Sequence, residues 1–422
     1  MLDATQALTV VAEIDPARRA LLDERLAAIA NDLAGNVVFR PHELPHTHFM
    51  RFVIVEQDGE LPALLAWEVN HDRDPRTYIA GALTVTPIEH VLECCHGYPV
   101  TRDLGARVGW LLGRSLRASA FYTAYRGVPR DQVVNDRRVH DAIREAIDTN
   151  GGRAALRRLP AREIQRQLHE HVRTTRPELD ISGTDGEVWR WALGKLLAAV
   201  FVGIPLLVLA LTVGPFWYVV LRARERREQP DPSRRPVHDE KGLAALEDRV
   251  TQNQLTHVVE IKPGWFRLAT LGLVLFAIDI AARVYSVRGN LGGIASIHFA
   301  RWVIIRDRWS EGRKRHRLVF FSNYDGSWES YLGEFIDRAA YGLTGVWSNT
   351  LDFPATRHLT GAGARDEEAF KQWTRDHQIP TQVWWSGVPD STVQNVLDDI
   401  WIRRNLDRGL PDDDLDAWLR RL

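Results

Sequence analysis

The chain has few of the features that mark common function classes. It has only two cysteines among 422 residues, Cys94 and Cys95, and adjacent cysteines rarely close an unstrained disulfide. We therefore expect no disulfide framework, which suits a reducing compartment. The net charge is −1, from 54 basic and 55 acidic residues, so no overall field would attract nucleic acid. The N-terminus has neither a basic start nor an apolar run, and we expect no secretory signal peptide.

Standard catalytic motifs are also missing. The sequence has no phosphate-binding loop, no GxGxxG after a strand, no His-Glu-x-x-His, no CxxC pair and no GxSxG. Two short segments contain metal-ligand residue types: His42, His46 and His48 form one, and the histidines and cysteines of 90–96 form the other. Imidazole and thiolate suit zinc, copper or iron, but neither spacing matches a standard site. We therefore expect no metal centre there.

What the chain does contain is one pattern of residues that occurs twice. Residues 8–16 return as 255–263, 47–54 as 297–304, 70–72 as 323–325 and 127–129 as 387–389. The order is kept, and the distance between matched residues grows slowly from 247 to 250, 253 and 260 residues. Chance matches would scatter in distance, so the sequence predicts two copies of one unit.

Each copy follows the order strand, helix, strand, strand, helix, strand. The predicted strands of the first copy are 7–14, 47–56, 62–69 and 119–126, and those of the second are 255–261, 297–306, 316–322 and 380–386. An apolar stripe over 328–346 predicts the clearest helix. This order is that of a ferredoxin-like unit. The predicted fold class is α+β: two fused βαββαβ units at 1–150 and 251–422 that form a pseudo-twofold barrel, with a helical insert at 151–250.

The insert contains a long apolar run. Residues 196–221 carry no charge and are followed by Arg222, Arg224, Arg226 and Arg227, which predicts a membrane segment with the cytoplasm on the arginine side. A buried core helix is the other interpretation. A second run near 265–285 contains Asp279 and is short for a span.

The position of the apolar run limits how it can lie in a membrane. A single crossing at 196–221 would separate the two copies, so we favour a re-entrant or shallow hairpin, interrupted at Pro205 and Pro215, with the 265–285 helix beside it. An ordinary span with copies that pair between molecules, as a homo-oligomer, is the alternative.

The candidates for chemistry are the polar residues that both copies share, and satisfied polar residues of a sheet are the other interpretation. They are His48 and His298, Arg51 and Arg301, Asn70 and Asn323, Asp72 and Asp325, and Asn135 and Asn395. Strand alternation places His298 and Arg301 on opposite faces. If Arg301 faces the barrel it needs an anionic partner, and otherwise His298 is the inward group. Asp325 stands between a strand and the 328–346 helix, where helix capping explains it equally, and Asn323 can brace the same turn.

The doubled pattern resembles the dimeric α+β-barrel superfamily over most of 7–145 and 255–407. Phe321-Ser322-Asn323-Tyr324-Asp325-Gly326 is similar to the Gly-x-x-Asp-Gly motif of its dye-decolourising peroxidases. This resemblance implies haem, with Asp325 as the acid-base group and Arg301 beside it on peroxide. A histidine of the second half, for which we take His298, would bind the iron.

Two hypotheses for function follow. The first is a membrane-associated, haem-dependent peroxidase or oxygenase of lipid-like or other apolar substrates, with Asp325, Arg301 and Asn323 as catalytic residues and His298 as the haem-binding residue. The second is a non-catalytic protein that binds lipid or an apolar small molecule, or acts as a scaffold, at the cytoplasmic face of a membrane.

Overall fold

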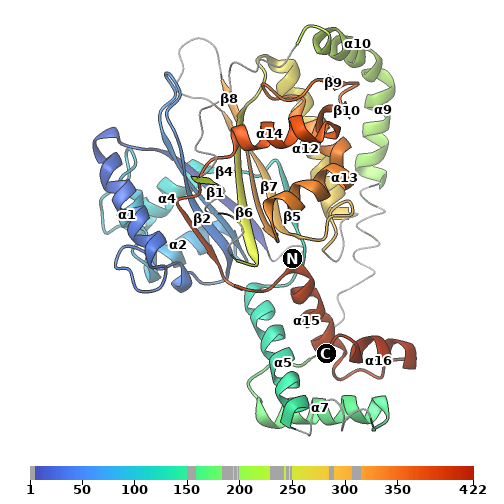
Figure 1. Ribbon diagram of the computed structural model, residues 1–422. Helices are drawn as coiled ribbons and strands as arrows, with labels where there is room; N and C mark the ends of the chain where they lie inside the picture. The colour runs from blue at the N-terminus through green and yellow to red at the C-terminus, as the bar shows by residue number, and fades with distance from the viewer. Residues whose placement is uncertain are drawn as a thin grey trace.

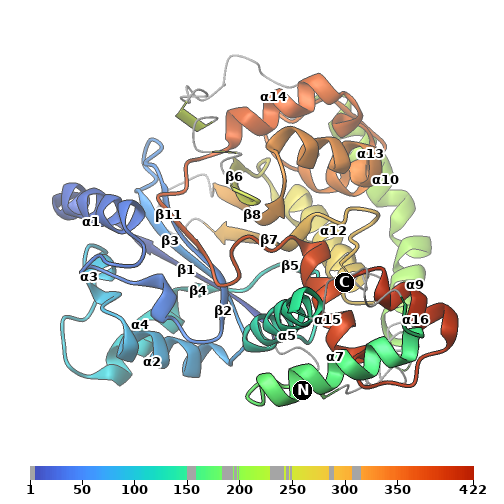
Figure 2. The ribbon, with the colours of Figure 1, turned by 60° about the horizontal axis from the view of Figure 1, so that its bottom comes forward.

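The computed structural model describes residues 5–149, 158–182, 199–228, 250–284, 289–306 and 315–422, together with Leu193, Leu197, Gly242, Leu243 and Glu247. These residues form an α+β fold whose two larger sheets are antiparallel throughout. The sheets face each other, and helices cover their outer sides (Figures 1 and 2). The predicted fold class is confirmed at this level.

The first sheet consists mainly of strands from the N-terminal half. Its strand order is β11-β2-β3-β1-β4, with β1 (Gln6–Glu13), β2 (Thr47–Val55), β3 (Leu64–His71), β4 (Ser115–Leu116) and β11 (Val383–Ser386). Its outer face packs against α1 (Arg19–Asn31), α2 (Pro75–Val85), α3 (Glu89–Leu92) and α4 (Leu104–Arg114). Met50, Phe52 and Trp67 are core residues of this layer.

The second sheet has the order β5-β7-β8-β6. It contains β5 (Ala120–Thr123), β6 (Gln252–Glu260), β7 (Ile297–Arg306) and β8 (His316–Asp325). Its outer face is covered by α12 (Trp265–Val284), α13 (Trp328–Trp347) and α14 (Glu367–His377), next to the small hairpin of β9 (Thr356–Arg357) and β10 (Gly361–Ala362). The apolar stripe that predicted a helix over 328–346 is α13, which is buried along that face.

The register of the two sheets is the same at matched positions. Gln6 of β1 lies opposite His71 of β3, and Asn253 of β6 lies opposite Tyr324 of β8. A ladder irregularity lies between Thr47 and Phe49 in β2 and recurs between Ile297 and Phe299 in β7. The repeated sequence therefore corresponds to repeated strand pairing, down to the position of the bulge.

The last predicted strand of each copy does not join its own sheet. Ala120–Thr123 pairs with β7 of the second sheet, and Val383–Ser386 pairs with β2 of the first. Only short segments that precede β5 and β11 pair with the sheet of their own half. Ser115–Leu116 pairs with β1, and Gln378 forms a bridge with His257 of β6. The exchange covers the free edges of β2 and β7. The predicted units 1–150 and 251–422 are therefore separate in the sequence, but each sheet contains a strand from both of them.

The predicted barrel does not close through hydrogen bonds among the described residues. Two separate sheets stack instead, and side chains from both fill the space between them. Val53, Ala66, Val303, Val319 and Phe321 belong to one buried cluster across this interface. Because these side chains pack against each other, the centre is a core and not a channel.

A group of helices projects from one end of the sheets. It consists of α5 (Arg130–Thr149), α7 (Ala161–Thr175), α15 (Val393–Asn405) and α16 (Asp412–Leu419), which the lower part of Figure 1 shows. These helices share a core of their own, in which Trp418 and Leu168 are buried. We refer to them as the helical module, which the sequence did not predict.

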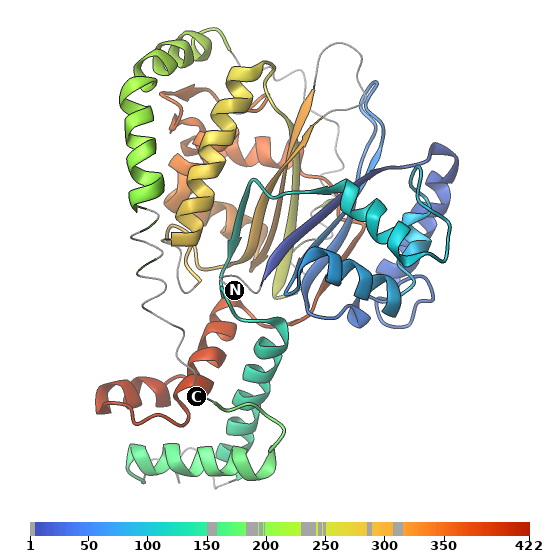
Figure 3. The ribbon, with the colours of Figure 1, turned by 180° about the vertical axis from the view of Figure 1, so that it is seen from behind.

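The apolar run 196–221 is described without a gap from Ala199 onward and is bent. A π-helical turn (Ala199–Gly203) leads into α9 (Ile204–Thr212), and α10 (Gly214–Glu225) starts after Val213. The break lies beside Pro215, one of the two prolines at which the sequence predicted an interruption, whereas Pro205 lies in the first turn of α9. Figure 3 shows α9 beside α12 and α10 turned across their end. Among the described residues, the helix long and apolar enough to cross a membrane is Trp265–Val284, and 33% of its most apolar window is buried.

Candidate functional site

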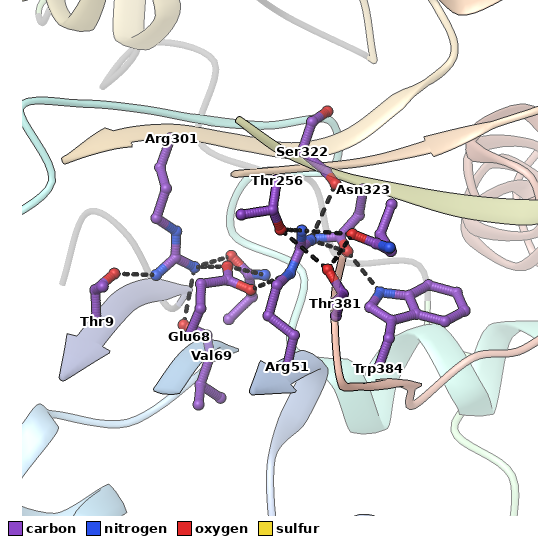
Figure 4. Close-up of polar contacts among 12 residues, drawn as sticks. Thr9, Arg51, Glu68, Val69, Thr256, Arg301, Ser322, Asn323, Thr381 and Trp384 are labelled. Atoms are coloured by element: carbon purple, nitrogen blue, oxygen red, sulfur yellow. Dashed lines mark hydrogen bonds and ion pairs between the residues drawn. The ribbon is translucent and has the colours of Figure 1, made fainter. Parts of the chain in front are cut away.

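The two repeated arginines meet at one glutamate between the sheets (Figure 4). Arg51 Nε lies 2.9 Å from Oε2 of Glu68, and Arg301 Nη2 lies 2.8 Å from Oε1 of the same carboxylate. The side chains of all three residues are at most 1% exposed. Charges buried so deeply are stable only when they are paired and hydrogen-bonded. We call these three residues the Arg-Glu-Arg triad.

Each arginine of the triad reaches across to the opposite sheet. Arg301 of β7 donates to the carbonyl oxygens of Leu8 and Val69, both at 2.8 Å, and to the side-chain oxygen of Asn70. Arg51 of β2 makes the matching set of bonds, to the carbonyl oxygens of Leu255 at 3.0 Å and Ser322 at 2.9 Å and to Asn323 Oδ1 at 2.6 Å. The contacts are therefore reciprocal between the halves.

At one position of the triad the two halves differ, because only the first half has a glutamate there. In the second sheet the residue that matches Glu68 is Phe321, whose ring centre lies 5.5 Å from the Arg51 guanidinium carbon. One carboxylate therefore serves two guanidinium groups. Burial lowers the pKa of Arg301 to about 10, although the charge of Glu68 opposes this change. At that pKa Arg301 is still charged at neutral pH.

The anionic partner expected for Arg301 is thus Glu68, which sequence reasoning missed. Its signal was present, because a single acidic residue stands inside the apolar strand 64–69. The terminal nitrogens of Arg301 are occupied by acceptors of the protein itself. Asn323 is occupied too, since its Oδ1 also accepts from Trp384 Nε1 at 2.9 Å. The catalytic roles predicted for Arg301 and Asn323 stay untested, and the geometry favours a structural role for both.

Two buried histidine–aspartate pairs lie at the end of the sheets next to the helical module. The Nε2 atoms of His48 and His298 lie 2.9 Å and 2.8 Å from Oδ1 of Asp72 and Asp325. The other oxygen of each carboxylate accepts from a backbone N–H, of Arg130 at 2.6 Å and of Val393 at 2.7 Å. These are the first residues of α5 and α15.

Each histidine–aspartate pair therefore ties one helix of the module to a sheet. Capping of the 328–346 helix by Asp325 was one expectation, and it is wrong, because the hydroxyl of Ser327 caps α13 by accepting from the N–H of Ser330. Asp325 is instead bound to the start of α15. Its second hydrogen bond comes from a helix 68 residues further along the chain, which no local pattern reveals.

Strand alternation placed His298 and Arg301 on opposite faces, and this expectation is also wrong. The irregularity between Ile297 and Phe299 interrupts the alternation, because a bulge adds one residue to the strand. Both side chains consequently contact the first half of the chain. The His298 ring lies 5.3 Å from that of Phe49.

A haem does not fit at His298. Its Nε2 bonds to Asp325, and its Nδ1 lies 3.2 Å from the hydroxyl of Tyr125, a group whose pKa burial raises well above its ordinary value. Neither ring nitrogen is left for iron. Two roomy cavities, of about 590 and 760 Å³, are lined by other residues. No group of three His, Cys, Asp or Glu side chains placed to hold a metal ion occurs in the part of the chain that the structure describes.

The helical module repeats the crossed pattern of the arginines. Asp136 of α5 lies 2.6 Å from Arg403 Nε of α15, and Asp399 of α15 lies 2.5 Å from His140 Nδ1 of α5. Asp136 and Asp399 are 263 residues apart, and so are His140 and Arg403, so each pair joins one position of α5 to the other matched position of α15. The distance of 260 that the sequence suggested for this region is therefore wrong by three residues. Asn395, expected to match Asn135, belongs to the capping box of α15.

Comparison of the chain with protein-family models, with curated proteins and with solved structures finds no match. The functional argument therefore rests on the geometry of this molecule.

Proposed function

We propose that this chain is a membrane-associated protein, built from two fused copies of a ferredoxin-like unit arranged as in the dimeric α+β-barrel superfamily, that binds a lipid-like or apolar small molecule without catalysing its conversion. The duplication is supported by the shared register and by the reciprocal contacts of Arg51 and Arg301. The non-catalytic assignment is supported by the partners that His298, Arg301 and Asn323 already have within the protein.

The observation that supports membrane association is an exposed apolar surface on α9 and α10. Leu211, Phe216 and Val219 are 69%, 77% and 66% exposed. The other side of α10 is held on the protein, because Trp217 Nε1 donates to Thr270 at 3.0 Å and Glu225 accepts from the N–H of Leu359 at 2.7 Å. A helix fixed by one face, with large apolar side chains on the other, is typical of proteins that lie on a bilayer.

The exchanged strands favour a shallow attachment over a crossing. β5 and β11 join each half to the sheet of the other, so both halves lie on one side of any membrane. The arginines at the end of α10 and just beyond it, at 222, 224, 226 and 227, suit the cytoplasmic face with its anionic lipids.

Membrane association is tested by replacing Leu211, Phe216 and Val219 together with serine. We expect the full chain to float with phospholipid vesicles and the triple variant to stay in the soluble fraction. The matched control replaces three exposed valines of the first half, Val37, Val85 and Val100, with serine. If the α9–α10 variant still floats, the attachment assigned to these helices is wrong, and Trp265–Val284 becomes the candidate anchor.

The enzymatic hypothesis has its own test. The absorption spectrum of the protein, purified in mild detergent and supplied with haem, would show a Soret band that disappears in His298→Ala if His298 binds iron. We expect no such band, because both nitrogens of this ring have partners.

A further inference from the structure

A cavity of about 590 Å³ lies on the outer side of the second sheet. Its walls come from α12, α13, the loop before β7 and β7 itself, through Ile278, Leu291, Trp302, Phe335, Ala339 and Leu343. The volume is within the range of pockets that hold small molecules. The cavity is separate from the triad and from the histidine–aspartate pairs, which do not line it.

The cavity is apolar with one charged group at its rim. Apart from the indole N–H of Trp302, only Asn290 and Arg338 bring polar side-chain groups to its lining, and no lining residue is acidic. Arg338 of α13 is exposed. Its stem lies over Gly293, where an added Cβ would come within 2.9 Å of the Arg338 Cδ atom. The loop therefore holds the base of this side chain close to the cavity.

Arg338 has no hydrogen bond or ion pair with any residue that the structure describes. The nearest acid along the same helix face is Glu334, one turn earlier, and its Oε2 already accepts from Ser296 Oγ at 2.8 Å. This contrasts with the buried arginines of the triad, whose partners lie within the protein. A free guanidinium beside an apolar cavity is suited to a carboxylate or phosphate.

We propose that this cavity binds a single-chain amphiphile, with the hydrocarbon chain between α12 and α13 and the anionic head group on Arg338. α12 contributes Ile278 and Ala281 to the wall along this hydrocarbon chain. The proposal deepens the proposed function, because it names the class of its ligand. It depends on ligand binding and not on membrane attachment.

Two glycines of α13 provide a matched pair of variants. A Cβ at Gly342, which lines the cavity, meets no atom within 4 Å, and the same is true at Gly333, which does not line it. Gly342→Phe therefore fills the cavity without a clash at its base, whereas Gly333→Phe adds the same ring to the same helix elsewhere. Both replacements remove a helical glycine, so their effects on helix stability should be similar.

The probe is a dansyl-labelled C11 fatty acid, bound to the delipidated full chain and displaced by oleate, oleyl alcohol or a lysophosphatidate. Gly342→Phe should weaken probe binding at least about tenfold, since filling a cavity opposes its ligand. Gly333→Phe should bind as the wild type does. Wild-type binding by Gly342→Phe would overturn the site.

The head-group assignment is tested with Arg338→Gln. This variant should lose about tenfold in affinity for oleate and keep its affinity for oleyl alcohol, because only oleate has a charge for Arg338 to bind. Arg76→Gln, at an exposed arginine of α2, is the control. If Arg338→Gln binds oleate as the wild type does, the head group is not on Arg338. Oleate and the lysophosphatidate distinguish a carboxylate from a phosphate ligand.

The same measurement on the soluble α9–α10 triple variant separates the two proposals. Probe binding with normal affinity by a protein that no longer floats would uphold both the cavity and the surface attachment. Normal flotation with no specific probe binding in the wild type would overturn the cavity alone.

Discussion

Replacement of Glu68 by glutamine tests whether the triad is the structural centre of the molecule. The change keeps the size and one acceptor of the side chain but removes its charge. Arg51 and Arg301, at most 1% exposed, then lack their shared counter-ion. Removing one partner of a buried ion pair typically costs about 3–5 kcal/mol, because a buried charge is left uncompensated. We expect Glu68→Gln to lower the free energy of unfolding by roughly that amount.

The control is an ion pair at the surface. Glu56 lies 2.8 Å from Arg19, but its side chain is 66% exposed, and a pair of this kind contributes about 0–1 kcal/mol. Urea unfolding of both variants, followed by tryptophan fluorescence, gives the comparison. If Glu68→Gln unfolds at the same urea concentration as Glu56→Gln, the triad is not a buried charged centre and the argument fails.

A second replacement identifies the cause of the loss. Arg301→Met removes one of the two cations, so in the double variant with Glu68→Gln only Arg51 is left without a counter-ion. The double variant should therefore lose less stability than the sum of the single variants, by about 0.5–3 kcal/mol. Additive losses would mean that the two side chains do not act as one charged group.

Three further variants test other parts of the structure. Burial lowers the pKa of His71 to about 3, so this ring is neutral when folded and gains a proton on unfolding below about pH 6.5. The free energy of unfolding should therefore fall by about 2 kcal/mol between pH 7 and pH 5 through this group. His71→Phe should reduce this dependence on pH, measured by urea unfolding at several pH values. An unchanged dependence would mean that other groups cause the acid sensitivity. Asp325→Asn should weaken the attachment of α15 by about 0.5–2 kcal/mol. Amide hydrogen exchange, relative to the wild type, should then become faster in α15 than in α14. An equal change in both helices would refute the anchoring role. Trp418→Ala should destabilise the helical module by about 3–5 kcal/mol, because this ring is fully buried in its core. Protease cleavage should then concentrate within the helical module, and an unchanged cleavage pattern would contradict a separate core.

Much of the secondary structure could be predicted because it depends on neighbouring residues. The strand predicted at 297–306 has the bounds of β7, and the helix predicted at 328–346 ends within one residue of α13. Alternation and helical periodicity are local properties, so they can be read along the chain. The doubled pattern also located the polar residues that the fold brings together, including His298, Arg301 and Asn323.

Local patterns failed where contacts join distant segments. The predicted last strands have the right type, but their partners lie in the opposite half, because an edge strand pairs with whichever free edge the packed fold presents to it. The direction of His298 was mistaken because a bulge is decided by the facing strand. The bend after α9 followed from Pro215, whereas the docking of α10 on Thr270 and Leu359 did not.

The sequence by itself determined the strands, several of the helices that cover the sheets and the set of polar residues that recur. Only the tertiary structure decided what those residues bind. Glu68 is the ion-pair partner of Arg301 although 233 positions separate them. Arg338 has no hydrogen bond or ion pair with a described residue, although Glu334 is one turn away. The reason is physical: backbone conformation follows from local sterics and hydrogen bonding, whereas the pairing of a buried charge depends on which segments meet when the core closes.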